Sequence, residues 1–252
     1  MRNLRLLALA VIAALGVTAV AFAQGSGNQY SLNADVKVRG GSPSKPKPGS
    51  FKLGFDISDP AGTVPQVVKT YFIGAEGLKV DTRAATRTCS AASLDRRQSD
   101  RHCPRAALIG SGTIRNFVAT PGEPVGSATR CTLPVKLYAA GRNRVAIWIQ
   151  TGPPNCIAAV AKAIDARFVR RNGVIGLQFT VPDELRHQLG LALPVSSVRT
   201  SFRKITRRIG RSRKQIGYFS STGCRDGRRD IIGRFTDETG RTVTAKTTLR
   251  RC

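Results

Sequence analysis

Apolar and polar residues alternate along several short segments of this chain. Between residues 30 and 38, and again between residues 51 and 57, every second position is apolar and most of the others are polar. Side chains of a β-strand point alternately to its two faces, so a period of two predicts strands with one buried and one solvated face. Shorter runs of β-branched, aromatic or alternating residues predict further strands at 67–73, 134–138, 145–149, 231–235 and 243–249.

The clearest local pattern is a β-hairpin centred on Asn172 and Gly173. Phe168 and Val169 precede this pair, and apolar residues alternate after it from residue 175 to residue 181. Asn and Gly both tolerate the positive φ angles of a type I′ turn. Helical content is expected to be small, with candidates at 155–165 and 182–188. The sequence therefore predicts an all-β fold: an antiparallel β-sandwich, Ig-like or jelly-roll-like, with one or two short helices.

Residues 1–23 have the features of a secretory signal peptide. Arg2 and Arg5 precede an apolar run, and the small residues Ala21 and Ala23 lie where a signal peptidase would cleave. An uncleaved anchor is the alternative, because the apolar run approaches the length of a membrane-spanning helix. We expect cleavage, which leaves one domain at residues 24–252 with a Pro- and Gly-rich loop at 39–50. No later stretch is apolar and long enough to span a bilayer, so we expect a secreted or envelope protein.

All the cysteines follow this leader, at Cys89, Cys103, Cys131, Cys156, Cys224 and Cys252. An even number of cysteines in an exported chain favours disulfides, because thiols are not kept reduced outside the cytosol. Sequence alone leaves the pairing open, and sequential pairing is our prediction because it closes the shortest loops. Zinc sites use cysteines separated by only a few residues, and no two of these cysteines are that close.

Several motifs resemble a family of uncharacterised secreted proteins that is common in actinobacteria. They are a Cys-Pro-x4-Ile-Gly-x-Gly pattern that begins at Cys103, a Gly-Tyr-Phe segment before Cys224, and the final Cys252. The resemblance covers nearly all of the expected mature chain and implies an exported, mainly β domain. It carries no catalytic or ligand-binding residues to transfer. The pair Cys131 and Cys156 lies outside the family pattern.

Residues suited to catalysis are few. The chain has two histidines, His102 and His187, and neither belongs to a His-Glu-x-x-His motif. Either could activate a serine, which makes a secreted hydrolase the alternative function, although no Gly-x-Ser-x-Gly elbow is present. No phosphate-binding or dinucleotide-binding glycine motif occurs, so we expect no cofactor and no metal.

Charge is the dominant feature, because 41 Lys and Arg residues face 15 Asp and Glu residues, for a net charge of +26. The densest basic run contains no acidic residue and comprises Arg199, Arg203, Lys204, Arg207, Arg208, Arg211, Arg213 and Lys214. A solvated loop that keeps the protein in solution is one interpretation. Such charge also attracts polyanions, so an anionic cell-wall polymer or an acidic glycan is the expected partner, with non-specific nucleic acid as a further one. Phe202 is the one aromatic residue in the run, which does not favour the reading of bases. We therefore predict a non-catalytic extracellular or envelope protein that binds anionic surfaces.

Overall fold

The computed structural model describes residues 27–250 except 158, 212 and 225. The predicted leader and Cys252 lie outside this part of the chain. Eleven strands form one antiparallel sheet, in the order β1-β3-β13-β6-β7-β8-β9-β10-β4-β17-β18. Their bounds are β1 (Gln29–Val36), β3 (Phe51–Ser58), β4 (Val68–Ala75), β6 (Leu108–Val118), β7 (Thr129–Ala139), β8 (Arg144–Thr151), β9 (Val160–Arg171), β10 (Val174–Thr180), β13 (Val195–Phe202), β17 (Arg229–Asp237) and β18 (Thr242–Leu249).

Short elements extend this sheet at its ends. A three-stranded sheet joins β2 (Lys47–Pro48), β16 (Phe219–Ser221) and β5 (Leu78–Val80), so the loop predicted at 39–50 contains a short strand. Two further pairs are β11 (His187–Gln188) with β12 (Leu191–Ala192), and β14 (Thr206–Ile209) with β15 (Lys214–Gly217). The helical segments are α1 (Ala91–Arg97), η1 (Thr82–Ala84), η2 (Arg105–Ala107) and η3 (Asp183–Leu185).

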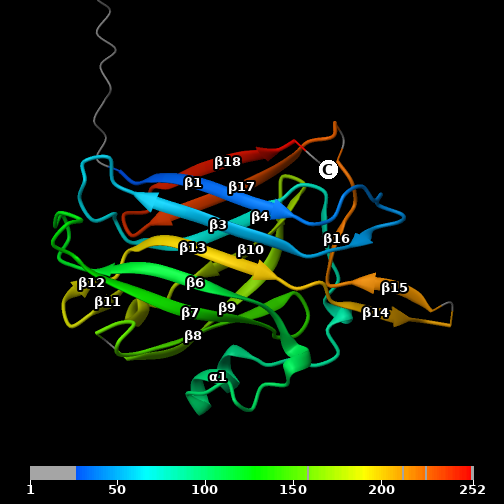
Figure 1. Ribbon diagram of the computed structural model, residues 1–252, viewed down its shortest axis with the longest axis horizontal. Helices are drawn as coiled ribbons and strands as arrows, with labels where there is room; N and C mark the ends of the chain where they lie inside the picture. Colours follow the sequence, from blue (N-terminus) through cyan, green and yellow to red (C-terminus); the bar gives the residue numbers. More distant parts are fainter. Residues whose placement is uncertain (1–26, 158, 212, 225, 251–252) are drawn as a thin grey trace, which may run out of the picture.

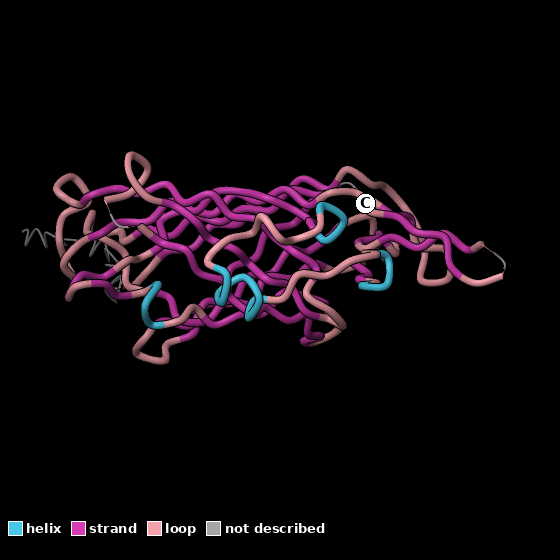
Figure 2. Tube along the Cα trace, turned by 90° about the horizontal axis from the view of Figure 1, so that it is seen from below, coloured by secondary structure: helices cyan, strands magenta, loops and turns pink. Residues whose placement is uncertain are grey.

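The main sheet curls until its two outermost strands, β1 and β18, lie side by side (Figure 1). The result is a flattened, nearly closed barrel, which is elongated when it is seen from below (Figure 2). This arrangement confirms the predicted all-β, antiparallel, sandwich-like fold: its layers are the opposite walls of one continuous sheet. Curling places one face of every strand in the interior, where the alternating apolar residues are removed from water.

Two apolar clusters make up most of the interior of the barrel. The larger one lies between β6, β7, β8 and β9, where Leu133, Val135 and Ile147 pack with Phe202 and Phe219. The smaller one lies between β3, β4 and β17 and is built on aromatic rings. In it, the rings of Phe55 and Phe235 are 5.3 Å apart, and Tyr71 stacks on Phe179 at 5.0 Å. Ring pairs at these distances add stability beyond the area they bury.

The predicted hairpin is confirmed between β9 and β10. Asn172 and Gly173 occupy its turn with φ angles of 48° and 79°. Both angles are positive, as a type I′ turn requires.

The helix predicted at 155–165 is wrong, because most of that segment belongs to β9. Its alanines suggest a helix, yet Ala161 and Ala163 lie on the strand face that another element covers, where small side chains let that element approach closely. Helix α1 packs there, with Leu94 beside Trp148 and Ala163, and Asp95 Oδ1 accepts a hydrogen bond from the Ala163 amide at 2.7 Å. The second candidate helix, at 182–188, is reduced to the single turn η3 followed by β11.

Two of the predicted disulfides are present. Cys89 is bonded to Cys103, with Cα atoms 5.5 Å apart, and Cys131 is bonded to Cys156, with Cα atoms 4.6 Å apart. The first closes the segment that carries α1, and the second ties β7 to the loop before β9. The third predicted pair cannot be followed, because Cys252 lies outside the described residues. Disulfides are compatible with an extracytoplasmic protein.

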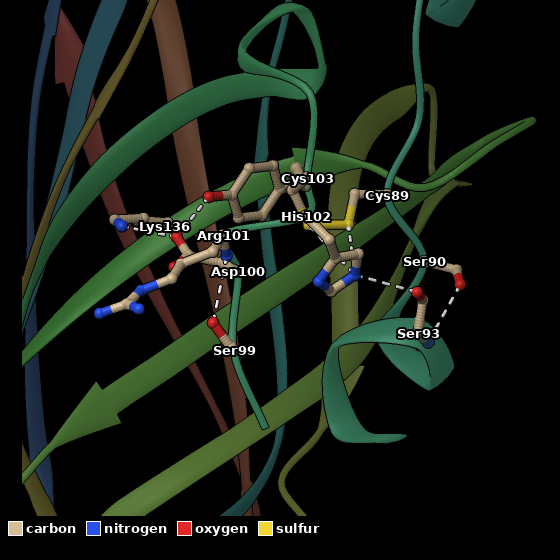
Figure 3. Close-up of a disulfide and its surroundings, with 10 residues drawn as sticks. Cys89, Ser90, Ser93, Ser99, Asp100, Arg101, His102, Cys103 and Lys136 are labelled. Carbon is tan, nitrogen blue, oxygen red and sulfur yellow. Dashed lines mark hydrogen bonds and ion pairs between the residues drawn. A yellow bond between two sulfur atoms is a disulfide. The ribbon is translucent and has the colours of Figure 1, made fainter. Parts of the chain in front are cut away.

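Asp100 anchors the loop that precedes the Cys103 half of the first disulfide (Figure 3). Lys136 Nζ and the Tyr138 hydroxyl both donate to Asp100 Oδ2, at 2.5 and 2.6 Å. Burial raises the pKa of the Asp100 carboxyl, but these two hydrogen bonds and the Lys136 charge outweigh it, so the pKa is below its ordinary value. Ionised Asp100 therefore stabilises the folded state.

We expect Asp100→Asn to lower the free energy of unfolding by about 1–3 kcal/mol at neutral pH, because two donors would lose a charged acceptor. A depressed carboxyl pKa contributes stability above its unfolded value, and that stability is lost as pH falls through the folded value. The difference from wild type should therefore shrink below about pH 4. Urea unfolding at several pH values measures this, with Asp183→Asn as the control because the Asp183 side chain is 76% exposed and its ion pair with Arg186 should contribute little. A difference that does not change with pH would contradict the assignment.

Candidate functional site

The structure divides the basic run between the barrel wall and a separate hairpin. Arg199 lies in β13, Arg203 and Lys204 follow that strand, and the remaining members belong to the hairpin formed by β14 and β15. Within the hairpin, Arg208 faces Gln215 and Ile209 faces Lys214. The hairpin projects from one end of the barrel (Figures 1 and 2). Most of the run therefore lies in a hairpin of two paired strands and does not form a simple solvated loop.

The members of this run differ in how their charge is balanced. All of them are exposed. Arg199 Nη2 lies 2.6 Å from Asp56 Oδ1, so its charge is neutralised on the barrel wall. Within the part of the chain that the structure describes, no carboxylate pairs with any of the others. The hairpin and the two residues before it keep their full positive charge.

A cleft of about 180 Å³ lies between the hairpin and the segment formed by β5 and η1. Lys214 and Ile216 line one side, and Lys79, Asp81 and Arg83 line the other. A hydrogen bond from Arg207 Nη1 to the Arg83 carbonyl oxygen, 3.3 Å long, links the two sides. Lys79 extends the basic surface and was not predicted, because it is far from the run in sequence.

Asp81 reduces part of this charge. Arg83 donates from Nε to Asp81 Oδ1 at 2.9 Å and from Nη2 to Oδ2 at 2.7 Å. These hydrogen bonds are the main cause that lowers the pKa of the Asp81 carboxyl, against a smaller opposing effect of burial. Asp81 is therefore ionised at neutral pH and neutralises Arg83, whereas Lys79 and Lys214 have no carboxylate within ion-pair distance among the described residues.

His102 lies against the first disulfide (Figure 3). Its Nε2 is 3.0 Å from Ser93 Oγ, and it is 3.8 and 3.9 Å from the sulfur atoms of Cys89 and Cys103. The cysteine sulfurs are bonded to each other, so they do not offer thiolates to a metal. The pair of Ser93 and His102 has the geometry of a nucleophile beside a base, which sequence reasoning missed because the serine lies in α1 without a motif.

The backbone around Ser93 is less suited to acyl transfer. The Ser93 amide donates to the carbonyl oxygen of Ser90 at 3.1 Å and to its Oγ at 3.3 Å, because Ser90 caps α1. An oxyanion hole needs amide donors aimed at the substrate oxygen, and this amide is already used. A catalytic histidine is usually oriented by a carboxylate. The carboxylate close to His102 in sequence, that of Asp100, instead accepts hydrogen bonds from Lys136 and Tyr138.

His187 belongs to a different group at the turn between β17 and β18. Its Nε2 is 2.8 and 2.9 Å from the two carboxylate oxygens of Glu238. Asp183 completes a set of three that could hold a metal ion. Arg186, however, pairs with both Glu238 and Asp183. The guanidinium occupies the position between the two carboxylates, so a cation would have to displace it.

Comparison of the chain with models of known protein families, with curated proteins and with solved structures returned no match. The resemblance to secreted actinobacterial proteins therefore stays a prediction. Among the described residues, no helix has both the length and the apolar character needed to cross a membrane.

Proposed function

We propose that this protein is an extracytoplasmic, non-catalytic binding protein that attaches to anionic polymers through the hairpin of β14 and β15. The observation that supports the proposal is the group of exposed cations without carboxylate partners on a projecting element. Elsewhere on the surface some cations, such as Lys136 and Arg144, pair with acids, and the exposed cations that do not, such as Arg87 and Arg142, are not gathered on one projecting element. Unpaired cations gathered on one element give a local positive potential that attracts polyanions.

The chemistry of the hairpin favours phosphodiester or carboxylate polymers, such as an anionic cell-wall polymer or an acidic glycan. Arginine presents a planar fork of donors that matches both phosphate and carboxylate. The apolar residues of the hairpin are Ile209 and Ile216, and it has no aromatic residue on which a base could stack. Nucleic acid would therefore bind through its backbone, without preference for sequence.

Secretion is part of this proposal. It is supported by the leader-like residues 1–23 and by two disulfides that would be reduced in a cytosol. An exported basic protein meets anionic wall and matrix polymers directly.

The first test replaces Arg207, Arg208, Arg211 and Arg213 together by Gln. Binding to poly(glycerol phosphate), measured by calorimetry at several salt concentrations, should weaken at least about tenfold, and the salt dependence should become shallower. The control replaces Arg87, Arg96, Arg97 and Arg142 by Gln, which removes the same charge from other exposed positions. If the control loses as much affinity as the hairpin variant, net charge and not the hairpin is responsible. Binding that is indifferent to salt would overturn the electrostatic proposal.

A hydrolase that uses His102 or His187 is the second candidate, and the contact between Ser93 and His102 favours it. If catalysis occurs there, Ser93→Ala and His102→Ala should each reduce turnover of a p-nitrophenyl ester by about 10³-fold or more. Our proposal predicts instead that both variants match the wild type in ester hydrolysis and in polymer binding. His187→Ala serves as the matched variant at the other histidine.

A further inference from the structure

The interior of the barrel is not completely filled by its own side chains. A cavity of about 150 Å³ lies between the two apolar clusters, lined by Leu133 and Val135 of the larger cluster and by Phe55 and Tyr71 of the smaller one. Protein interiors are close-packed and rarely leave voids larger than a water molecule. Barrels of eight strands have interiors that side chains just fill, and this sheet of eleven strands encloses more space.

Side chains in the middle of the strands face this cavity. Leu53, Ile114, Leu177 and Val198 line it and are only partly buried. Each of them packs against an apolar cluster of the interior, so the surface that it still exposes faces the cavity. An apolar cavity of this size does not hold water well and accepts apolar molecules.

The lining of the cavity extends along the barrel. It includes Val195 and Phe202, the first and last residues of β13. Along an extended strand these two residues are about 23 Å apart, at about 3.3 Å per residue. A volume of about 150 Å³ within such a length is narrow, so it fits an unbranched chain better than a compact molecule.

A buried amide in the lining lacks a hydrogen-bond donor. Asn116 of β6 is 5% exposed and lies opposite Val195 in the sheet. Its Nδ2 donates to the Phe117 carbonyl oxygen at 3.2 Å, but no group among the described residues donates to its Oδ1. A buried polar atom without a partner costs stability, and a hydroxyl group on a ligand would supply the missing donor. The Tyr71 hydroxyl, which also belongs to a lining residue, lacks a partner as well.

The polar groups at the other end of the cavity already have partners. Arg229 is 2% exposed, its Nη2 donates to Ser221 Oγ at 2.6 Å, and it makes a further interaction. It therefore does not select a charged ligand. Most of the remaining lining is apolar, and an ion that enters an apolar site loses its hydration without compensation. The cavity favours an uncharged ligand.

We propose that the barrel interior binds an unbranched aliphatic alcohol, with its hydrocarbon chain along β13 between the two apolar clusters and its hydroxyl group donating to Asn116 Oδ1. One hydrogen-bonding group at the end of an apolar site fixes the orientation of such a ligand. The site is separate from the basic hairpin, so it is a second binding function and does not depend on the proposed attachment to polymers.

A series of primary alcohols from butanol to dodecanol tests the apolar part of the site by calorimetry. Affinity should rise about fourfold per methylene and then level off once the cavity is filled. 1-Octanol should bind at least about tenfold more tightly than octanoate or octylammonium, because both ions would lose their hydration. Equal or tighter binding of either ion would overturn the assignment to an uncharged ligand, and no binding by any alcohol would overturn the site.

The hydroxyl group is tested with 1-methoxyheptane, an isomer of 1-octanol that accepts hydrogen bonds but cannot donate them. 1-Octanol should bind about threefold or more tightly than this ether, because only the alcohol can donate to Asn116 Oδ1. Asn116→Leu, which has a similar size, should remove the difference and leave the affinity of the ether nearly unchanged. A preference for the alcohol that persists in Asn116→Leu would overturn the placement of the hydroxyl group.

Substitutions on β13 locate the binding site. Val198→Phe adds a ring to the cavity and should weaken 1-octanol binding by about tenfold or more, whereas Ser201→Phe on the outer face should leave it unchanged. Ile114→Phe offers a second way to fill the cavity if the first variant does not fold, which circular dichroism would reveal. Equal binding by the inward and outward variants would place the ligand elsewhere.

The hairpin variant separates this inference from the proposed function. Arg207→Gln, Arg208→Gln, Arg211→Gln and Arg213→Gln together should weaken polymer binding and leave 1-octanol affinity unchanged. If 1-octanol affinity falls with them, the alcohol binds outside the barrel and the interior site is wrong.

Discussion

The continuous hydrogen-bond ladder of the eleven-stranded sheet is the constraint on which the structure depends. β13 pairs with both β3 and β6, and β4 pairs with both β10 and β17. These pairings join strands that are far apart along the chain. Because every buried backbone amide and carbonyl must find a partner, the sheet can bury apolar residues only if these ladders remain complete. Its curl then brings the outermost strands together and leaves little of an exposed edge.

The same ladder separates the cationic hairpin from the apolar interior. Strands β14 and β15 pair only with each other among the described strands, and their charged side chains are exposed, although Ile216 of β15 packs against the larger apolar cluster. An element of this kind can carry many like charges, because each charged side chain remains solvated. The interior is mostly apolar, and among the described residues the buried guanidinium of Arg229 makes a hydrogen bond to the Ser221 hydroxyl in addition to its other interactions. The unpaired charge of the hairpin therefore lies where water solvates it, and most of the apolar surface lies in the interior, where burying charge is costly.

Local patterns predicted the elements whose cause is local. The strand at 51–57 alternates because one of its faces is buried, and the turn at Asn172 and Gly173 needs residues that tolerate positive φ. The segment at 155–165 was misread because its small residues fit the packing of α1 against β8 and β9 and do not reflect a helical preference of the segment itself. Helix α1 itself was not expected, since its seven residues contain only one fully buried side chain, Leu94.

The candidate sites divide in the same way. The arginines of the hairpin are adjacent in sequence, so charge density alone revealed them. Lys79, Arg83 and Ser93 join their partners only after folding, and no sequence pattern marks them. The cavity is the extreme case, because it depends on how side chains from nearly every strand of the sheet fit against one another.

The sequence by itself determined the strand-rich character and the location of the basic run, because alternation and charge density are properties of neighbouring residues, whereas the pairing of the first four cysteines was one prediction among several possible pairings that the structure confirmed. Only the tertiary structure decided that the sheet curls into a nearly closed barrel, that Arg199 is neutralised by Asp56, and that a cavity lies beside Arg229. Those features depend on contacts between residues more than a hundred positions apart, and short-range patterns carry no information about such contacts.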